Sequence, residues 1–357
     1  MNRNNNFDNR IYPSDSTIGW QQRDSTQPLL SVRQATRDIL DCADDFIVMK
    51  QSVDTLYQLF CRITQVDASN LNGNKDIMLS SGKAISTSAA AHCLLEMKRT
   101  AVFLRGIHRA ISKKTAENKS KPVQLLYAGT GPYGTLVIPL LTLLSKEEVS
   151  VDLIDINPES LNALQTLIEA LRLEKYIGEV HCTDATSFTV GKEYDIVVSE
   201  TMLACLKNEP QVAIMQNLIP QLSPDAIFIP EEISIDAALT NPKMEQERLF
   251  YYDGKQPPFR RIALGNLFTV NKQHLDTDRM QKTVTIPDDK DFPVLKLFTT
   301  VHVFGNEMLS ENDSSITMPV IFYNLHRQPV RHVAFAYVQG EKPHIESRIV
   351  DTPDEDN

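Results

Sequence analysis

Two glutamates nine positions apart, Glu200 and Glu209, are the residues whose type and spacing most directly suggest chemistry. They bracket a segment that follows the apolar run 194–199 and enters a stretch with helical spacing. If the segment folds back on itself, both carboxylates face one pocket, where they repel each other unless a cation lies between them. A guanidinium suits that position, because its planar fork of N–H donors pairs with carboxylates in bidentate geometry. The alternative is that Glu209 only favours a helix N-terminus through the helix dipole and faces water.

A glycine-rich turn forms a second candidate site earlier in the chain. Gly129, Gly131 and Gly134 come after the apolar run 123–128, which is typical of a buried parallel strand, and precede an apolar stretch of helical length at 135–144. A strand, a glycine turn and a helix let the backbone approach a nucleotide-like ligand closely. Such turns also occur for purely geometric reasons, so the interpretation depends on the residues downstream of the turn.

Acidic residues mark the ends of the next strands. The run 151–156 predicts a second strand and contains Asp155 near its end, where an acid is placed to accept hydrogen bonds from both hydroxyls of a ribose. The alternative is an ordinary cap cluster for the helix that begins at Asn157 and Pro158. A third strand at 179–182 is followed by Asp184, and a fourth at 194–199 by Glu200. All these acids lie at the carboxyl ends of strands, which is where open α/β sheets bind ligands.

The elements that would position these residues predict an α/β protein with a Rossmann-like sheet. We expect a flexible N-terminus at 1–30, a helical segment at 31–120, a Rossmann-like domain at 121–230, a β-rich domain at 231–350 and an acidic tail at 351–357. Apolar spacing predicts two or three amphipathic helices over 31–66 and one long helix over 88–111. The segment 67–75 is a loop by composition, and the charged run 113–122 is a linker into the first strand.

The pattern changes after the fourth strand. A helix is expected over 209–222 and a fifth strand over 226–229. Alternation and β-branched residues then predict six short strands without intervening helices, which together form an antiparallel barrel or sandwich. These six strands are expected at 233–239, 263–270, 282–286, 294–304, 317–323 and 330–338.

Composition and charge limit the class of partner. The chain has 357 residues and a net charge of −10, which argues against a nucleic-acid backbone or an anionic membrane surface as the main partner. Its five cysteines show no metal-binding or disulfide spacing and indicate free thiols in a reducing compartment. The polar N-terminus is unlike a signal peptide, and no apolar run reaches about 18 residues. We therefore expect a soluble, cytoplasmic protein.

The sequence resembles the protein arginine methyltransferase family, a branch of the class I S-adenosylmethionine-dependent methyltransferases. Ser199-Glu200-Thr201-Met202, with Glu209 beyond it, resembles the double-E loop of that family, and the segment 95–100 resembles the helix that closes over its cofactor. The resemblance implies a Rossmann-like methyltransferase domain, S-adenosylmethionine as the cofactor and a homodimer. By resemblance, the residues that bind the cofactor are those of the glycine turn, Arg99 for the methionine carboxylate, Asp155 for the ribose, and Asp184 and Ala185 for the adenine. The residues that bind the acceptor are Glu200, Met202 and Glu209, with Glu200 and Glu209 catalytic.

Departures from the family pattern narrow the expected acceptor. Tyr127 stands where the family usually has an acid, and the glycine spacing has one extra residue. The Thr-His-Trp motif of the family is not found: the single tryptophan is Trp20, and the segment 315–319 lies where the motif would be expected. We therefore expect a guanidine N-methyltransferase that acts on free arginine or another small guanidino compound. The alternatives are a protein arginine methyltransferase, a methyltransferase acting on an oxygen or an ordinary amine, and a non-catalytic cofactor-binding scaffold.

Overall fold

The structure is a computed structural model that describes residues 27–69, 75–118, 120–248, 260–325 and 330–352. The expected flexible N-terminus and acidic tail fall largely outside these ranges, as does most of the expected loop at 67–75. Residues 27–30, which were assigned to the flexible N-terminus, instead form the first turn of a helix. Within the described ranges, none of the helices combines the length and the apolar character that crossing a membrane requires.

Two helices and a hairpin open the described chain. α1 (Gln27–Asp41) and α2 (Phe46–Thr64) bury one face each, with Val32 and Ile39 on α1 and Val53 and Phe60 on α2 among the fully buried side chains. This confirms the amphipathic helices predicted over 31–66. The strands β1 (Ile77–Leu79) and β2 (Gly82–Ala84) pair as an antiparallel hairpin that the sequence pattern did not predict.

The single helix predicted over 88–111 is wrong, because the chain is broken at Glu96. The structure has α3 (Thr87–His92), the 3-10 helix η1 (Cys93–Leu95) and then α4 (Met97–Glu117). Glu96 has ψ 78°, which is outside the helical range, and the Thr100 hydroxyl donates to the Leu94 carbonyl across the break. α4 also includes residues 113–117, which were expected to belong to the charged linker.

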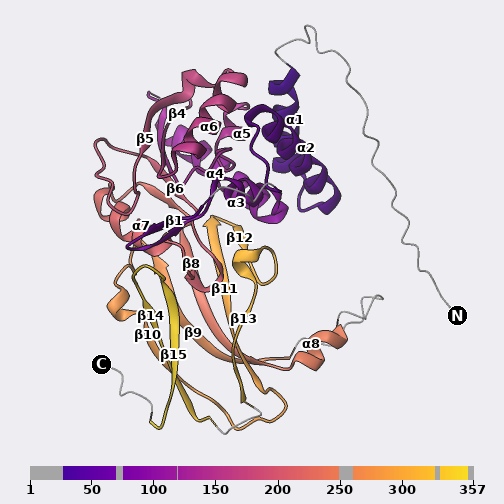
Figure 1. The fold of residues 1–357 in the computed structure, drawn as a ribbon, viewed down its shortest axis with the longest axis vertical. Helices are drawn as coiled ribbons and strands as arrows, with labels where there is room; N and C mark the ends of the chain where they lie inside the picture. The colour runs from indigo at the N-terminus through magenta and orange to yellow at the C-terminus, as the bar shows by residue number, and fades with distance from the viewer. Residues whose placement is uncertain (1–26, 70–74, 119, 249–259, 326–329, 353–357) are drawn as a thin grey trace, which may run out of the picture.

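A five-stranded parallel sheet lies in the upper part of the molecule in Figure 1. Its order is β5-β4-β3-β6-β7, and all neighbouring strands pair in parallel. The predicted strands are confirmed with small changes at their ends, as β3 (Val123–Ala128), β4 (Val149–Asp155), β5 (Ile177–Cys182), β6 (Ile196–Ser199) and β7 (Ile227–Ile229). The chain winds outward in both directions from β3, so the topological switch point lies at the carboxyl ends of β3 and β6.

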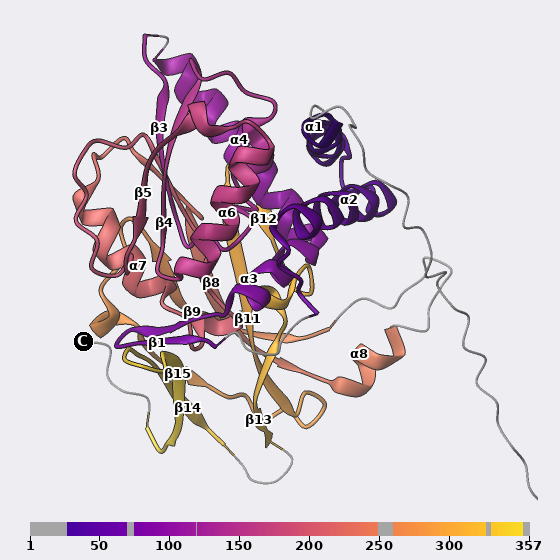
Figure 2. The ribbon, with the colours of Figure 1, turned by 45° about the horizontal axis from the view of Figure 1, so that its top comes forward.

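The connections around this sheet contain helices that are shorter than predicted. Where a helix over 135–144 was expected, the chain makes successive turns and only α5 (Ile138–Leu141) is helical, because the amides of Val137 and Ile138 both donate to the carbonyl of Gly134. α4 and α6 (Pro158–Ala170) lie on one face of the sheet and α7 (Gln211–Leu218) on the other (Figure 2). The remaining connections include the 3-10 helices η2 (Glu174–Tyr176), η3 (Ala204–Leu206) and η4 (Ile219–Gln221).

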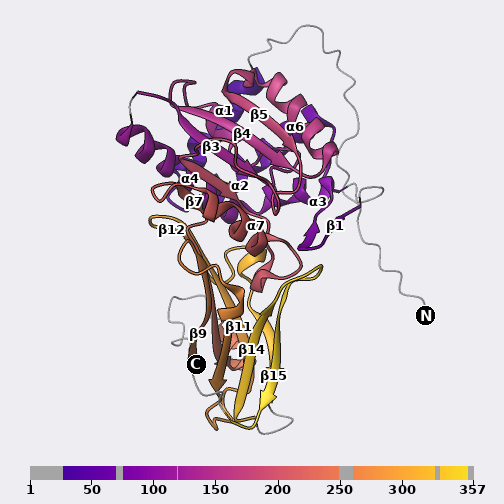
Figure 3. The same cartoon turned by 90° about the vertical axis from the view of Figure 1, so that its left-hand side faces the viewer.

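The C-terminal half forms two antiparallel sheets below the parallel one (Figure 3). One sheet has the order β12-β11-β8-β9 with β13 paired to β11, and the other has the order β10-β14-β15. Phe322 and Phe335 pack edge to face across the two sheets, with ring centroids 5.6 Å apart. The elements are β8 (Glu232–Thr240), α8 (Pro242–Arg248), β9 (Ile262–Asn271), η5 (Thr277–Arg279), β10 (Gln281–Thr285), β11 (Val294–Phe304), β12 (Glu307–Leu309), η6 (Ser315–Thr317), β13 (Val320–Asn324), β14 (His332–Val338) and β15 (His344–Val350).

The six predicted strands of this half are therefore present, but the expectation that no helix interrupts them is wrong, because α8 comes directly after β8. The short strand β12 and the last strand, β15, were not predicted. Both extend a pairing that the neighbouring strand begins, β12 on β11 and β15 on β14. The outcome is the Rossmann-like α/β architecture with N-terminal helices and a β-rich C-terminal part that the sequence predicts.

A buried ion network joins α4 to the antiparallel sheets. Glu307 on β12 accepts a hydrogen bond from Arg105, at 2.9 Å, and lies 2.9 Å from Arg109. Arg105 also contacts Asp44, at 2.7 Å. Since the side chains of Arg105 and Glu307 are both largely removed from water, these contacts hold α4 in a defined position relative to β11 and β12.

Candidate functional site

A cavity of about 330 Å³ lies at the carboxyl ends of β3, β4 and β6. This is the crevice that the strand order predicts for a ligand, and the volume is in the range of small-molecule sites. Its lining includes every residue that the sequence assigned to the site except Gly134. Those lining residues are Arg99, Gly129, Gly131, Asp155, Asp184, Ala185, Glu200, Met202 and Glu209.

The glycine turn and Asp155 form one wall of the cavity. Gly129 and Gly131 have φ of +78° and +60°, which favours glycine, and a Cβ on Gly129 would lie 2.5 Å from the Thr201 methyl group. Gly134 does not line the cavity. A Cβ there would lie 2.5 Å from the side chain of Ile138, so glycine is needed at this position for close packing. The glycines thus allow the turn to pack closely against the helix and against the loop after β6.

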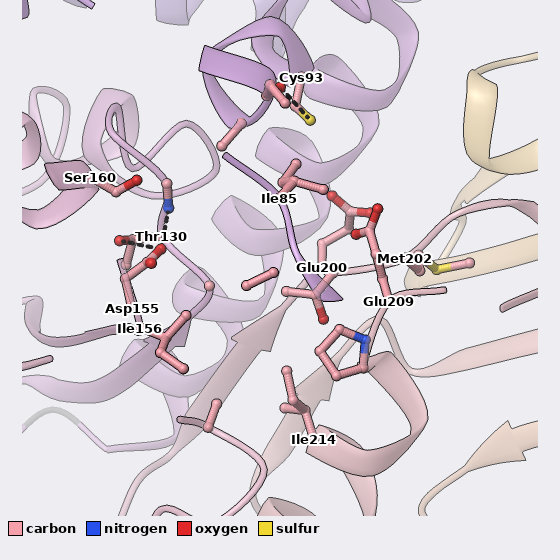
Figure 4. A pocket seen from close by; sticks show the side chains of 18 of the residues that line it. Ile85, Cys93, Thr130, Asp155, Ile156, Ser160, Glu200, Met202, Glu209 and Ile214 are labelled. Atoms are coloured by element: carbon pink, nitrogen blue, oxygen red, sulfur yellow. Dashed lines mark hydrogen bonds between the residues drawn. The ribbon is translucent and has the colours of Figure 1, made fainter. Parts of the chain in front are cut away.

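Asp155 is buried at the end of β4 and is held by backbone amides. One carboxylate oxygen accepts from the Asn157 amide and the other from the Gly131 amide, both at 2.8 Å. The second oxygen also accepts from the Thr130 hydroxyl, at 3.4 Å (Figure 4). Burial raises the pKa of Asp155, and the hydrogen bonds from Asn157 and Gly131 oppose that rise. The helix cap of α6 is Asn157, so the alternative interpretation of this acidic cluster accounts for Asn157 but not for the position of Asp155 in the cavity.

Asp184 and Ala185 lie on the loop after β5 and line the same cavity as Asp155. Asp184 accepts a hydrogen bond from the Thr186 amide at 2.8 Å, which fixes its side chain in a short turn. The side chain of Asn217, in the last turn of α7, donates to the Ala185 carbonyl at 2.9 Å. This loop is therefore anchored from the helix behind it.

Glu200 and Glu209 lie next to each other at the opposite end of the cavity (Figure 4). Glu200 pairs with a cation of the chain itself: Arg99, in the first turn of α4, donates from Nη2 to Oε2 of Glu200. Glu96 also approaches Arg99, at 3.7 Å. The Glu200 side chain is only 1% exposed, and its other oxygen, Oε1, has no hydrogen-bond partner in the described part of the chain. A buried carboxylate oxygen without a donor is unusual and indicates a position for a ligand donor.

The second glutamate is unlike an ordinary surface acid. Glu209 is 7% exposed, so the interpretation in which it faces water is wrong. Burial raises the pKa of Glu209 to about 7, against the positive charges of Arg99 and Lys83, which lower it. Near neutral pH its carboxyl group is therefore present in both the protonated and the ionised form.

The loop that carries the two acids is held on several sides. Gln211 on α7 accepts from the Thr201 amide at 2.8 Å and donates to the Ser199 carbonyl at 3.2 Å. The Cys205 amide donates to the hydroxyl of Thr299 on β11, at 2.9 Å. The amide of residue 208 donates to the carbonyl of residue 343, at 2.7 Å, in the connection between β14 and β15. The position of Glu209 thus depends on both halves of the chain.

Several lining residues were not predicted from the sequence. Lys83 and Ile85 come from the β1–β2 hairpin and the residue after it, and Glu96 comes from the break before α4. Ser315 comes from η6, where the Ser314 hydroxyl and the Ser315 amide donate to Glu96 at 2.7 and 3.3 Å. The acid at position 96 was recognised only as part of a motif. No sequence signal places Ser314 against it, because the two residues are more than two hundred positions apart.

Comparisons with known proteins yield structures but no sequence relatives. No family model matches the chain, and no curated protein matches its sequence. Among solved structures, the chain is similar to the Trypanosoma brucei PRMT1 enzyme–prozyme heterotetrameric complex with AdoHcy, with 13% sequence identity and a TM-score of 0.48, over 72% of this chain and 90% of that chain. It is also similar to PRMT6, with 13% identity and a TM-score of 0.47, over 69% of this chain and 95% of that chain. A likeness at this level says nothing about the activity or the ligands of this chain.

Proposed function

We propose that the protein is an S-adenosylmethionine-dependent N-methyltransferase whose acceptor is the guanidinium group of free arginine or of another small guanidino compound. The contact between Arg99 and Glu200, beside Glu209, is the observation that carries this proposal. A guanidinium of the chain itself lies in the acidic end of the cavity, so the shape and charge there suit this group. The unpartnered Oε1 of Glu200 offers a further acceptor to a ligand with several N–H donors.

The residues on the other side of the cavity fit the proposed cofactor. A carboxylate has about four acceptor positions, and Asp155 uses three of them, on the amides of Gly131 and Asn157 and on the hydroxyl of Thr130, which leaves about one for a ribose hydroxyl. Arg99 has five N–H donors and would hold the carboxylate of the cofactor. Asp184 and Ala185 would lie at the adenine. When bound there, S-adenosylmethionine would supply a methyl group activated by the positive charge of its sulfonium.

The two glutamates would prepare the acceptor for this transfer. A free guanidinium is a poor nucleophile because its lone pairs are delocalised. Carboxylates at Glu200 and Glu209 would draw the positive charge toward the nitrogens that they bind and orient the remaining nitrogen. Glu209 is suited to receive the proton that the methylated nitrogen loses, because its pKa is near neutral. Neutral and anionic compounds would leave buried acids unpaired, so the site disfavours them.

The small-molecule acceptor is proposed over protein arginine because of the β1–β2 hairpin. The hairpin packs against the loop that carries Glu209, and residues 79 and 83–85 contribute to the cavity lining. An acceptor must therefore fit beneath it. A protein arginine methyltransferase is the main alternative. A methyltransferase that acts on an oxygen or an ordinary amine would not need two adjacent acids. A non-catalytic scaffold would not need a glutamate with a pKa near 7.

A transfer assay with labelled S-adenosylmethionine tests the proposal, with free arginine and an arginine-containing peptide offered side by side. Methylated free arginine is the expected product. Transfer only to the peptide would support the protein arginine alternative. Binding of the cofactor without transfer to any guanidino compound would contradict the proposed reaction while leaving the cofactor site in place.

A further inference from the structure

The β1–β2 hairpin contacts both the loop that carries Asp184 and the loop that carries Glu209. The hydroxyl of Ser81, in the turn of the hairpin, lies 3.4 Å from that of Thr186, in the loop after Asp184. The Lys83 amide donates to the Asn208 carbonyl at 2.8 Å. A Cβ on Gly82 would lie 3.0 Å from the carbonyl groups of residues 208 and 209. The hairpin is therefore in direct contact with the acid loop, the segment 200–209 that carries Glu200 and Glu209. Figures 1 and 2 show β1 crossing beneath the parallel sheet near α7.

Lys83 is the residue of this hairpin that brings a positive charge to the cavity. Its ammonium group contacts Asp76 at 2.7 Å, and the other oxygen of Asp76 accepts from the Ser86 amide at 2.9 Å. The lysine is thus held in place by an acid that is itself fixed. An ammonium group has three donors, so the contact with Asp76 leaves others for a ligand. The half-buried Lys83 lies one residue along the hairpin from the close contact with Glu209.

The charges around the cavity make Lys83 stand out. Five carboxylates line it, on Glu96, Asp155, Asp184, Glu200 and Glu209. Within the described lining, lysine and arginine occur only at positions 83 and 99. Arg99 contacts Glu200 and, in the proposed function, holds the carboxylate of the cofactor. Lys83 is a second cation in this acidic cavity, and its charge lowers the pKa of Glu209.

We propose that Lys83 binds the carboxylate of the acceptor, so that the hairpin selects a free guanidino acid over both decarboxylated and peptide-bound arginine. This inference rests on the proposed function. Free arginine carries a guanidinium at one end and a carboxylate at the other, which matches the glutamates and Lys83 at neighbouring positions of one cavity. An arginine within a peptide has a neutral amide in place of the carboxylate and gives Lys83 no anion to pair with. Lys83 therefore acts on substrate choice.

The test compares arginine, agmatine (arginine without its carboxylate) and a peptide with an internal arginine. The natural protein is expected to use arginine with a kcat/KM about 10- to 100-fold above that of agmatine, as one charge-assisted hydrogen bond would provide. Lys83→Met should lower kcat/KM for arginine to the level of agmatine, mainly through KM. The variant also raises the pKa of Glu209, an effect common to both acceptors that its change in kcat/KM for agmatine measures, and the loss for arginine should exceed it about 10-fold or more. Lys83→Arg should restore most of the preference. Lys282→Met, which removes an exposed lysine from β10, serves as the matched control.

Binding measurements separate this inference from the proposed function. In calorimetry with S-adenosylhomocysteine present, arginine should bind the natural protein more tightly than agmatine does, and Lys83→Met should remove the difference. Equal use of arginine and agmatine by the natural protein, or an equal loss for both in Lys83→Met, would overturn the role of Lys83 while leaving guanidine methylation intact. Failure of every guanidino compound to bind or react would instead refute the proposed function.

Discussion

Replacing Glu209 with glutamine should make the protein more stable and less active, because the buried carboxyl group is costly to ionise. Burial raises the pKa of Glu209 from 4.5 to about 7. An acid with a raised pKa favours the folded state fully only below its unfolded pKa. That contribution is lost as the pH rises through the folded pKa, since the unfolded chain then ionises freely and the folded one does so at a cost. Glutamine never ionises and avoids this cost.

The size of the effect can be worked out from the two pKa values. Ionisation of Glu209 should cost less than about 1 kcal/mol of folding free energy at pH 5 and about 3 kcal/mol at pH 8. Glu209→Gln should therefore have nearly the stability of the natural protein at pH 5 and gain on the order of 2 to 3 kcal/mol at pH 8. Urea unfolding at the two pH values measures this difference. Glu193→Gln, at an exposed position, is the control and should change stability little at either pH.

Activity should move in the opposite direction. The ionised fraction of a group with a pKa of about 7 grows roughly tenfold between pH 6 and pH 8, so kcat/KM for the acceptor should rise by about that factor. Glu209→Gln should lose about 100-fold in kcat/KM and lose this pH dependence, since the glutamine leaves a buried guanidinium without its anion. If the variant has the same stability profile and the same pH profile as the natural protein, Glu209 is not a buried, acceptor-facing acid.

Four further predictions concern the cofactor, the glycine turn, the contact between α4 and β12, and the oligomeric state. Arg99 contacts Glu200, so it should compete with an acceptor for that carboxylate until the cofactor's own carboxylate binds Arg99. In equilibrium dialysis, arginine should therefore bind at least about tenfold more weakly without S-adenosylhomocysteine than with it, and equal affinities would contradict this. Gly129→Ala should cost about 2 kcal/mol of unfolding free energy, measured in urea, because φ is +78°. Arg105→Met should cost about 3 kcal/mol in the same assay by leaving Glu307 without its buried partner, whereas a value near zero would show that Arg109 suffices. The expected homodimer predicts a particle of two 40.3 kDa chains in sedimentation, and a single-chain mass would refute it.

The parallel sheet was predictable because its signals are local. Strands buried on both faces appear as continuous apolar runs, and the residues at their carboxyl ends must lie at one edge of the sheet. The run 123–128 therefore predicts β3 with its correct ends, and Asp155 and Glu200 do line one cavity. The glycine spacing was less informative. It predicted a ligand-binding turn, but it did not show that Gly134 packs against α5 instead of lining the cavity.

The features that were missed depend on contacts between distant segments. Apolar spacing continues through residue 96, so the sequence predicted one helix where the carboxylate of Glu96 in fact binds Ser314. The strands of the β1–β2 hairpin have three residues each, too few for a periodic signal, and the hairpin is fixed by bonds to Asn208 and Thr186. Sequence reasoning brought Arg99 and Glu200 into one site, yet only the structure shows that they contact each other.

The β-rich half influences the cavity through the conformation of the acid loop. Among the described lining residues, only Ser315 comes from that half. Within the loop, however, Cys205 and Leu206 have φ of 58° and 55°, a conformation that costs a residue with a side chain about 1 kcal/mol or more. The hydroxyl of Thr299 holds the first of these residues, and that of Tyr337 lies 3.5 Å from the carbonyl of the second. These contacts hold the loop in this conformation, so the antiparallel sheets contribute to the position of Glu209.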